Sequence, residues 1–259
     1  MNLKVHHIHE DPSTLHVGTC PNRSYYIPYA DEKEAENGVS SRVISLNGEW
    51  AFQYFDSYKD AVESDGTVDF TEEDMDTIPV PSCWQNYGYG RHMYTNVQYP
   101  FPCDPPYVPE ENPCGLYVRH IQVEDPAAYS WYLNFEGVDS CFYLWINGEF
   151  VGYSQVSHST SEFDISTALT AGDNVISVLV VQWCDGSYLE DQDKLRMSGI
   201  FRDTYILARP QNHIRDYFVK ESFSDDFSHA TVNVELKLNG TCTVTGVLTA
   251  PNGEKVGEA

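Results

Sequence analysis

Basic residues are scarce in this sequence, which holds 15 Lys and Arg against 39 Asp and Glu and so has a formal net charge of −24. A field of that sign repels phosphate groups. We therefore expect neither nucleic acid nor an anionic membrane surface as a partner. Solubility is the simpler consequence of such a charge.

Long apolar runs are missing as well. No stretch approaches the ~18 consecutive apolar residues of a membrane-spanning helix. Residues 1–12 lack the apolar run of ~7 to 15 residues that marks a secretory signal. These absences predict a cytoplasmic protein without a membrane anchor.

The cysteines show neither a metal-binding nor a disulfide pattern. There are seven of them, an odd number, and none forms a CxxC pair. Such spacing indicates neither a zinc site nor a complete disulfide framework. Reduced thiols in a cytosolic protein are the simpler explanation.

A histidine cluster near the N-terminus is open to two interpretations. His6, His7 and His9 could be interpreted as metal ligands. Chain termini usually fray, so we favour a frayed polar segment over a metal site.

Aromatic residues are abundant, and the patterns around them predict an all-β protein. The chain has 18 Tyr, 12 Phe and 5 Trp, which suit both strands and stacking on sugar rings. Alternation over residues 130–136 places Trp131, Leu133 and Phe135 on one strand face. The apolar run 175–181 predicts a central sandwich strand.

Turn signals divide this β region. Asn147-Gly148 predicts a hairpin, and Asn47-Gly48 between two apolar runs predicts another. A short helix is expected around Tyr58 to Glu63. Residues 78–115 hold eight prolines together with many aromatics, which predicts a long ordered surface loop.

Three parts of the chain are expected. Residues 1–41 are polar and predict an irregular N-terminal segment, and residues 42–210 predict a single β domain. Residues 211–259 contain strand-like runs but number only 49, whereas an immunoglobulin-like sandwich takes about 100 residues. We expect this second unit to be incomplete, with an unsatisfied apolar face.

The loop after the predicted central strand is the first place to look for function. Residues 185–203 contain five carboxylates and three basic residues directly after the apolar run. A polar loop at the end of a buried strand is where a rigid scaffold usually presents binding groups.

Four segments carry a family resemblance. They are YTNVQYPFPCDPPYVPEENPCGLY (94–117), FEGVDSCFYLWINGEFVGYSQ (135–155), SEFDIS (161–166) and WCDGSYLEDQDKLRMSGIFRD (183–203). Together they resemble the N-terminal region of bacterial β-galactosidases of glycoside hydrolase family 2, from about Leu46 to beyond Phe227. DGSYLEDQD and RMSGIFRD are specific to the β-galactosidase branch, whereas β-glucuronidases and β-mannosidases share the broader fold.

The resemblance implies the architecture. In that family a jelly-roll sugar-binding domain comes first, an immunoglobulin-like domain second, and a TIM barrel with both catalytic glutamates third. It implies a jelly-roll β-sandwich over residues 42–210 followed by an incomplete immunoglobulin-like β-sandwich over 211–259. By this resemblance, residues 1–259 all lie before the barrel. We therefore expect them to include no catalytic residue.

The resemblance also implies two binding residues. Asn96 matches a family asparagine that reaches the barrel's active site and hydrogen-bonds substrate. Asp185 matches a family aspartate that contacts galactose hydroxyls and ligates a sodium ion, although Cys184 stands where serine is expected. The other sodium ligands come from the barrel, so Asp185 forms only a partial sodium site. The magnesium of the parent enzyme is expected outside this chain.

Plainer alternatives exist for these residues. An Asp-Gly pair such as Asp185-Gly186 is often only a turn, and Asn96 alone could serve only to satisfy backbone groups. Several other polar residues could be imagined as an acid and base or nucleophile pair: Glu190, Asp191 and Asp193, or His158 with Glu162. We favour instead that the three loop carboxylates pair with Arg196 and Arg202 to fix the loop. Trp145 and Trp183 are expected in the core.

Three functions remain open from the sequence. The favoured one is the N-terminal part of a cytoplasmic β-galactosidase, which shapes the galactoside pocket, contacts the barrel portion and belongs to a homo-oligomer. The alternatives are a freestanding carbohydrate-binding module and a purely structural assembly piece. The isolated 259-residue chain is expected to be inactive in the favoured case.

Overall fold

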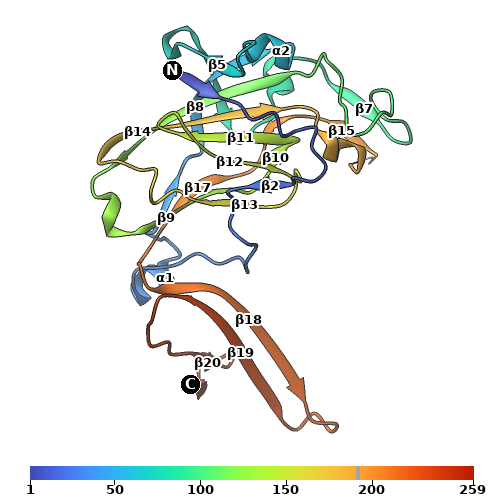
Figure 1. Ribbon diagram of the computed structural model, residues 1–259. Coiled ribbons are helices and arrows are strands. Elements are labelled where there is room, and N and C mark those ends of the chain that lie inside the picture. The colour runs from blue at the N-terminus through green and yellow to red at the C-terminus, as the bar shows by residue number, and fades with distance from the viewer. Residues whose placement is uncertain (191–192) are drawn as a thin grey trace. The chain divides into compact units, whose positions relative to one another are not determined.

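The computed structural model describes residues 1–190 and 193–259 and is built mainly of β-strands (Figure 1). The chain divides into two compact units. Unit 1 comprises Met1–Asn22 and Ile27–Ala208, and unit 2 comprises Arg23–Tyr26 and Arg209–Ala259. The predicted all-β class is confirmed.

Unit 1 is a sandwich of two main sheets. The larger has seven antiparallel strands in the order β2-β12-β11-β14-β8-β4-β6. Its strands are β2 (His16–Val17), β4 (Gly48–Phe55), β6 (Asp76–Val80), β8 (Cys114–Val123), β11 (Cys141–Ile146), β12 (Glu149–Gln155) and β14 (Gly172–Val181). The smaller sheet has the order β13-β9-β17-β3. Its strands are β3 (Val43–Ser45), β9 (Ser130–Phe135), β13 (Ser161–Asp164) and β17 (Thr204–Arg209).

Short strand pairs and helical turns complete unit 1. The pairs are β1 (Asn2–Lys4) with β5 (Thr67–Asp69), β7 (Met93–Thr95) with β15 (Lys194–Arg196), and β10 (Val138–Asp139) with β16 (Gly199–Ile200). The helices are α1 (Glu32–Asn37) and α2 (Tyr58–Ala61), the latter as predicted. The 3-10 turns are η1 (Glu72–Asp74), η2 (Trp84–Tyr87), η3 (Pro126–Ala128) and η4 (Asp185–Tyr188). No helix within residues 1–190 and 193–259 is long and apolar enough to cross a bilayer.

The larger sheet is buried on both faces. On β11, Phe142 and Leu144 join the core between the two sheets, whereas Cys141, Tyr143 and Trp145 join a second core on the opposite face. Such alternation follows from the two-residue period of a strand. The central position predicted for residues 175–181 is confirmed, because β14 lies between β11 and β8.

The hairpins predicted at Asn47-Gly48 and Asn147-Gly148 have different outcomes. Asn147-Gly148 forms the predicted hairpin between β11 and β12, with φ values of 54° and 83° that suit its left-handed turn. The prediction of a hairpin at Asn47-Gly48 was wrong. There β3 pairs with β17 in the smaller sheet, whereas β4 pairs with β6 and β8 in the larger sheet. The turn therefore carries the chain from one sheet to the other.

The N-terminal residues, expected to be irregular, contribute β1, β2 and α1. Leu3 is fully buried, and the indole of Trp145 donates to the Lys4 carbonyl at 3.0 Å. The backbone N–H of Ile8 donates to the Tyr143 hydroxyl at 2.7 Å. These contacts hold residues 1–10 against the second core.

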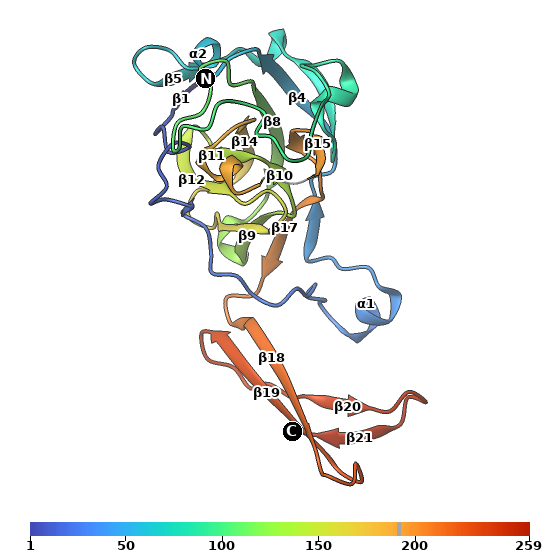
Figure 2. The same cartoon turned by 90° about the vertical axis from the view of Figure 1, so that its right-hand side faces the viewer.

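Unit 2 consists of two hairpins, β18 (His213–Phe223) with β19 (Ala230–Asn239) and β20 (Val247–Thr249) with β21 (Lys255–Glu258), seen in Figure 2. The Ser24 N–H donates to Asp216 at 2.8 Å, which joins residues 23–26 to this unit. Phe218 and Val234 are 57% and 53% exposed. These apolar side chains of β18 and β19 are therefore largely open to solvent.

Candidate functional site

Two loops that are far apart in the sequence form one surface in unit 1. Strands β7 and β15 pair with Thr95 opposite Lys194, which joins the proline-rich loop to the polar loop. The Tyr99 hydroxyl donates to the Tyr188 carbonyl at 3.0 Å. The Tyr188 hydroxyl in turn donates to the Tyr107 carbonyl at 2.5 Å. Both loops singled out from the sequence therefore lie together.

Asn96 lies at the exposed edge of this surface, directly after β7. Its side-chain oxygen accepts from the Val97 N–H at 2.6 Å, and its amide also hydrogen-bonds Tyr94. The Tyr94 hydroxyl donates to the Asp193 carboxylate, and this bond raises the pKa of Tyr94. Asn96, Tyr94 and Asp193 thus form one exposed polar group.

Asp185 lies elsewhere, at the start of η4, and its side chain is 9% exposed. Its carboxylate accepts from the Gly186 N–H at 2.9 Å and from the Gln155 amide. Burial raises its pKa, and the nearby Asp11 carboxylate raises it further. No hydrogen bond joins Asp185 to Asn96 in the part of the chain that the structure describes.

The surroundings of Asp185 suit a hard cation. The Asp185 N–H donates to the His9 carbonyl at 2.8 Å, which brings residues 9–11 and the Asp11 carboxylate beside it. Carboxylate and amide oxygens are the ligands that alkali and alkaline-earth cations prefer. Burial is the main cause of the raised Asp185 pKa, and repulsion by Asp11 is a smaller one. A cation beside the two carboxylates would relieve that repulsion, so Asp185 and Asp11 are the side chains that would hold the sodium ion implied by the family resemblance.

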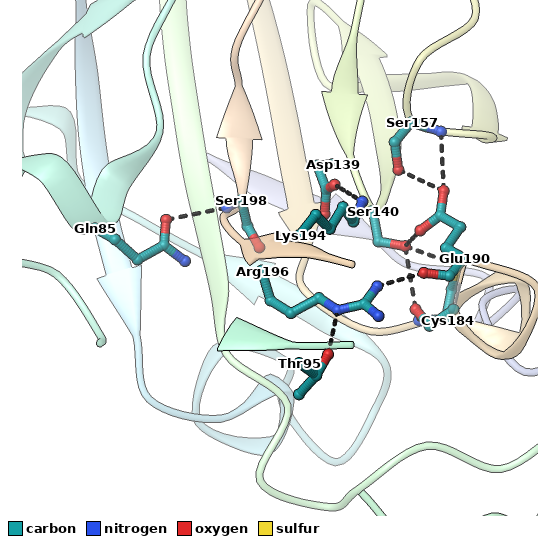
Figure 3. A network of polar contacts seen from close by, with 11 residues as sticks. Gln85, Thr95, Asp139, Ser140, Ser157, Cys184, Glu190, Lys194, Arg196 and Ser198 are labelled. Atoms are coloured by element: carbon teal, nitrogen blue, oxygen red, sulfur yellow. Dashed lines mark hydrogen bonds and ion pairs between the residues drawn. The ribbon is translucent and has the colours of Figure 1, made fainter. Parts of the chain in front are cut away.

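Glu190 and Arg196, which were expected to pair, both belong to a network of polar contacts beneath the polar loop, and its serine members were not predicted (Figure 3). The Glu190 carboxylate accepts from Ser157 Oγ at 2.7 Å and from Ser140 Oγ at 3.4 Å. The Arg196 guanidinium donates to Thr95 Oγ1 at 2.8 Å and to the Glu190 main-chain carbonyl. Arg196 therefore ties the polar loop to β7, and the Glu190 carboxylate is held by serines.

Asp139 is the most perturbed carboxyl of this network. Burial raises its pKa to about 7, and the neighbouring Glu190 acts in the same direction. Lys194 Nζ lies 3.4 Å from Asp139 Oδ2 and offsets part of that shift. In the sequence, Asp139 is recognisable only as a carboxylate between the strand patterns of residues 130–146. Nothing in the pattern indicates that its side chain is largely covered.

The other residues considered from the sequence do not form an acid and base pair among the described residues. His158 packs against the Phe201 ring with centroids 5.2 Å apart, whereas Glu162 lies buried in β13 opposite Asn134. Asp191 lies outside the described residues. Arg202, expected to pair with a loop carboxylate, donates to the His158 carbonyl at 3.1 Å. Trp145 and Trp183 are buried, as predicted, at 0% and 8% exposure.

A two-sheet β-sandwich with long polar loops defines the class of this protein, an all-β module whose candidate site is built on its loops. The profile for "Glycosyl hydrolases family 2, sugar binding domain" matches residues 43–210. The chain belongs to glycosyl hydrolase family 2.

Individual relatives agree with this assignment. A protein of Actinobacillus pleuropneumoniae named "Beta-galactosidase" is 50% identical over 229 residues, which are 87% of this chain and 22% of that protein. A "Beta-galactosidase" of Staphylococcus xylosus is 45% identical over 255 residues, 96% of this chain and 25% of that protein. The chain therefore spans a quarter or less of the length of these curated relatives.

Solved structures show the same fold. A "Beta-glucuronidase" from an uncultured Clostridium sp. aligns with a TM-score of 0.60 and 19% identity, over 84% of this chain and 37% of that one. One from Lactobacillus rhamnosus aligns with a TM-score of 0.59 and 21% identity, over 84% and 36%. At such identities the likeness concerns the fold alone.

Proposed function

We propose that this chain is the N-terminal part of a β-galactosidase that hydrolyses terminal β-D-galactosides such as lactose. The observation that carries the proposal is 50% identity over 229 residues to a relative named "Beta-galactosidase", of which these residues are 22%. In this proposal the chain shapes the substrate pocket and subunit contacts of a homo-oligomer. The catalytic groups belong to the barrel portion, which is its partner.

Within this function, Asn96 is the residue that meets the substrate from this chain. It is exposed, and its neighbour Asp193 is exposed and linked to it through Tyr94. An amide both donates to and accepts from sugar hydroxyls, and a carboxylate accepts from two neighbouring hydroxyls. The geometry therefore favours Asp193 beside Asn96 for the galactose contact that the family resemblance assigned to Asp185.

Asp185 is the cation ligand in this proposal. Its burial beside Asp11 and Gln155 supports a sodium ion held by oxygen atoms and does not support a direct sugar contact. Bound sodium would keep Asp185 ionised and fix residues 9–11 against η4, which is the edge of the sugar-facing surface.

Reconstitution tests the proposed function. We expect the pure 259-residue chain to release no product from a chromogenic galactoside, because both catalytic carboxylates lie outside it. Mixing it with the C-terminal remainder of the Actinobacillus pleuropneumoniae relative should restore turnover. Turnover by the chain alone, or saturable galactoside binding to it in calorimetry without any complementation, would support the freestanding alternatives instead.

Substitutions in that reconstituted enzyme test the residue roles. Losing a charge-assisted hydrogen bond costs about 1.5 to 3 kcal/mol, so Asp193→Asn and Asn96→Ala should each lower kcat/KM by roughly tenfold to a hundredfold. Asp185→Asn should instead raise the sodium concentration that gives half-maximal activity. Glu36→Gln, an exposed change on α1, is the matched control and should leave both quantities unchanged.

These assignments are contradicted if Asp185→Asn lowers kcat/KM at saturating sodium while Asp193→Asn has no effect. That result would show that Asp185, and not Asp193, contacts the sugar.

A further inference from the structure

Three side chains of the N-terminal segment gather beside a cavity in unit 1. One ligand atom from each of His7, His9 and Glu10 lies within 4.8 Å of the others. His7 Nε2 is 3.0 Å from Glu10 Oε2. The three residues line a cavity of about 370 Å³ together with Tyr58 and Tyr107. The sequence interpretation of a frayed segment therefore does not hold for His9 and Glu10, which are buried and half-buried.

His9 is the fixed member of this group. Its ring is 2% exposed and lies between Tyr58 and Tyr143, with centroids 4.6 and 6.2 Å away. Its Nδ1 is 2.9 Å from the Tyr143 hydroxyl. Among the described residues its Nε2 has no hydrogen-bond partner. A buried imidazole whose second nitrogen is held by a polar group is the usual form of a metal-ligating histidine.

Glu10 is also held in place. Its Oε1 accepts from the Val108 N–H at 2.9 Å, which leaves Oε2 facing His7. Two ligands bound at about 2.0 to 2.1 Å in a tetrahedral site lie about 3.4 Å apart, so the 3.0 Å separation of His7 and Glu10 needs only a small adjustment. Two imidazoles and a carboxylate, with a fourth position open to a cavity, form a typical zinc donor set.

We propose that His7, His9 and Glu10 form a binding site for a divalent transition-metal ion of the zinc class, with an open coordination position facing the cavity. All three ligands come from residues 7–10, and Glu10 is itself fixed to the loop by the Val108 N–H. In the proposed site, bound metal therefore ties His7 and His9 to Glu10 and through it to this loop.

Metal binding also defines the tautomer of His9. A metal at Nε2 requires the proton on Nδ1, from which it is donated to the Tyr143 oxygen 2.9 Å away. Without metal, the Tyr143 hydroxyl can donate to Nδ1, because its oxygen already accepts from the Ile8 N–H. Tyr143 is thus a positioning residue, and removal of such an outer group typically weakens metal affinity 10- to 100-fold.

Calorimetry with zinc tests the site. The experiment uses the untagged 259-residue chain with the exposed thiols removed (Cys103→Ser, Cys242→Ser) after treatment with a chelator. We expect one zinc ion per chain, with magnesium giving no comparable heat. His7→Ala and Glu10→Gln should each weaken zinc binding at least about tenfold. Zinc should also raise the melting temperature of the parent chain but not of His7→Ala.

The neighbouring His6 is the matched control, because it is exposed and lies outside the ligand set, with its ring centroid 4.3 Å from that of Phe150. His6→Ala should keep zinc affinity within about twofold of the parent. The proposal is overturned if the parent chain binds no zinc, if His6→Ala loses as much affinity as His7→Ala, or if magnesium binds equally well. His7 is largely exposed, so its replacement tests binding without disturbing the core.

Discussion

Replacing Arg196 with methionine is expected to destabilise unit 1 by about 3 kcal/mol or more. Arg196 is 5% exposed and bonds both Thr95 and the Glu190 carbonyl, so its loss leaves buried acceptors unpaired. It also removes the positive charge that lies near Asp139. All five tryptophans lie in unit 1, so the change is measurable by urea unfolding followed by tryptophan fluorescence.

Arg202→Met is the matched control for this experiment. Arg202 is exposed and donates to the His158 carbonyl at 3.1 Å, so its loss should cost under about 1 kcal/mol. Equal effects of the two substitutions would show that the buried network does not hold the polar loop.

Asp139→Asn should change how the stability of unit 1 depends on pH. The Asp139 carboxyl has a pKa of about 7 in the folded protein, raised from an ordinary value of 3.8, chiefly by burial. Between these values the folded state binds the proton more tightly than the unfolded state, so the contribution of this group falls as pH rises from 4 to 7. The rise of the Asp139 pKa from 3.8 to about 7 corresponds to roughly 4 kcal/mol at most.

The asparagine side chain cannot ionise, so the free energy of unfolding of the variant should not fall between pH 4 and 7 for this reason. We expect its free energy of unfolding to exceed that of the parent above pH 7 by up to roughly 4 kcal/mol, less what the Lys194 contact contributes, with the difference shrinking toward pH 4. The measurement is urea unfolding of both proteins at intervals from pH 4 to 8. Asp104→Asn, an exposed change, should give a profile parallel to the parent. A parallel profile for Asp139→Asn would contradict the raised pKa.

Local patterns predicted the fold where the chain pairs with its sequence neighbour. Alternation placed Trp131, Leu133 and Phe135 on one strand face, and in the structure all three join the inter-sheet core. Asn147-Gly148 joins two strands that pair with each other, and the hairpin prediction was right. Asn47-Gly48 has the same two residues, but its flanking strands pair with segments about 30 to 160 residues away. Turn chemistry carries no information about such distant partners.

The site was predictable in position but not in detail. The polar loop and the proline-rich loop were both identified, because charge and proline content are visible in sequence. Which carboxylate lies beside Asn96 depends on the pairing of β7 with β15, which brings Tyr94 to Asp193. The burial of Asp139 and Asp185 depends on the N-terminal segment and the network beneath the loop. Neither is visible in the residues next to them.

The N-terminal segment has a consequence for how the chain is made. His16 of β2 contacts Ser154, 138 residues further along, and Ile8 contacts Tyr143, 135 residues further along. At a ribosomal elongation rate of roughly 5 to 20 residues per second, the first strands wait on the order of ten seconds for their partners. During that interval Leu3 of β1 lacks the side chains of β11 that share its core, so the earliest part of the chain to be synthesised is among the last to reach its native packing.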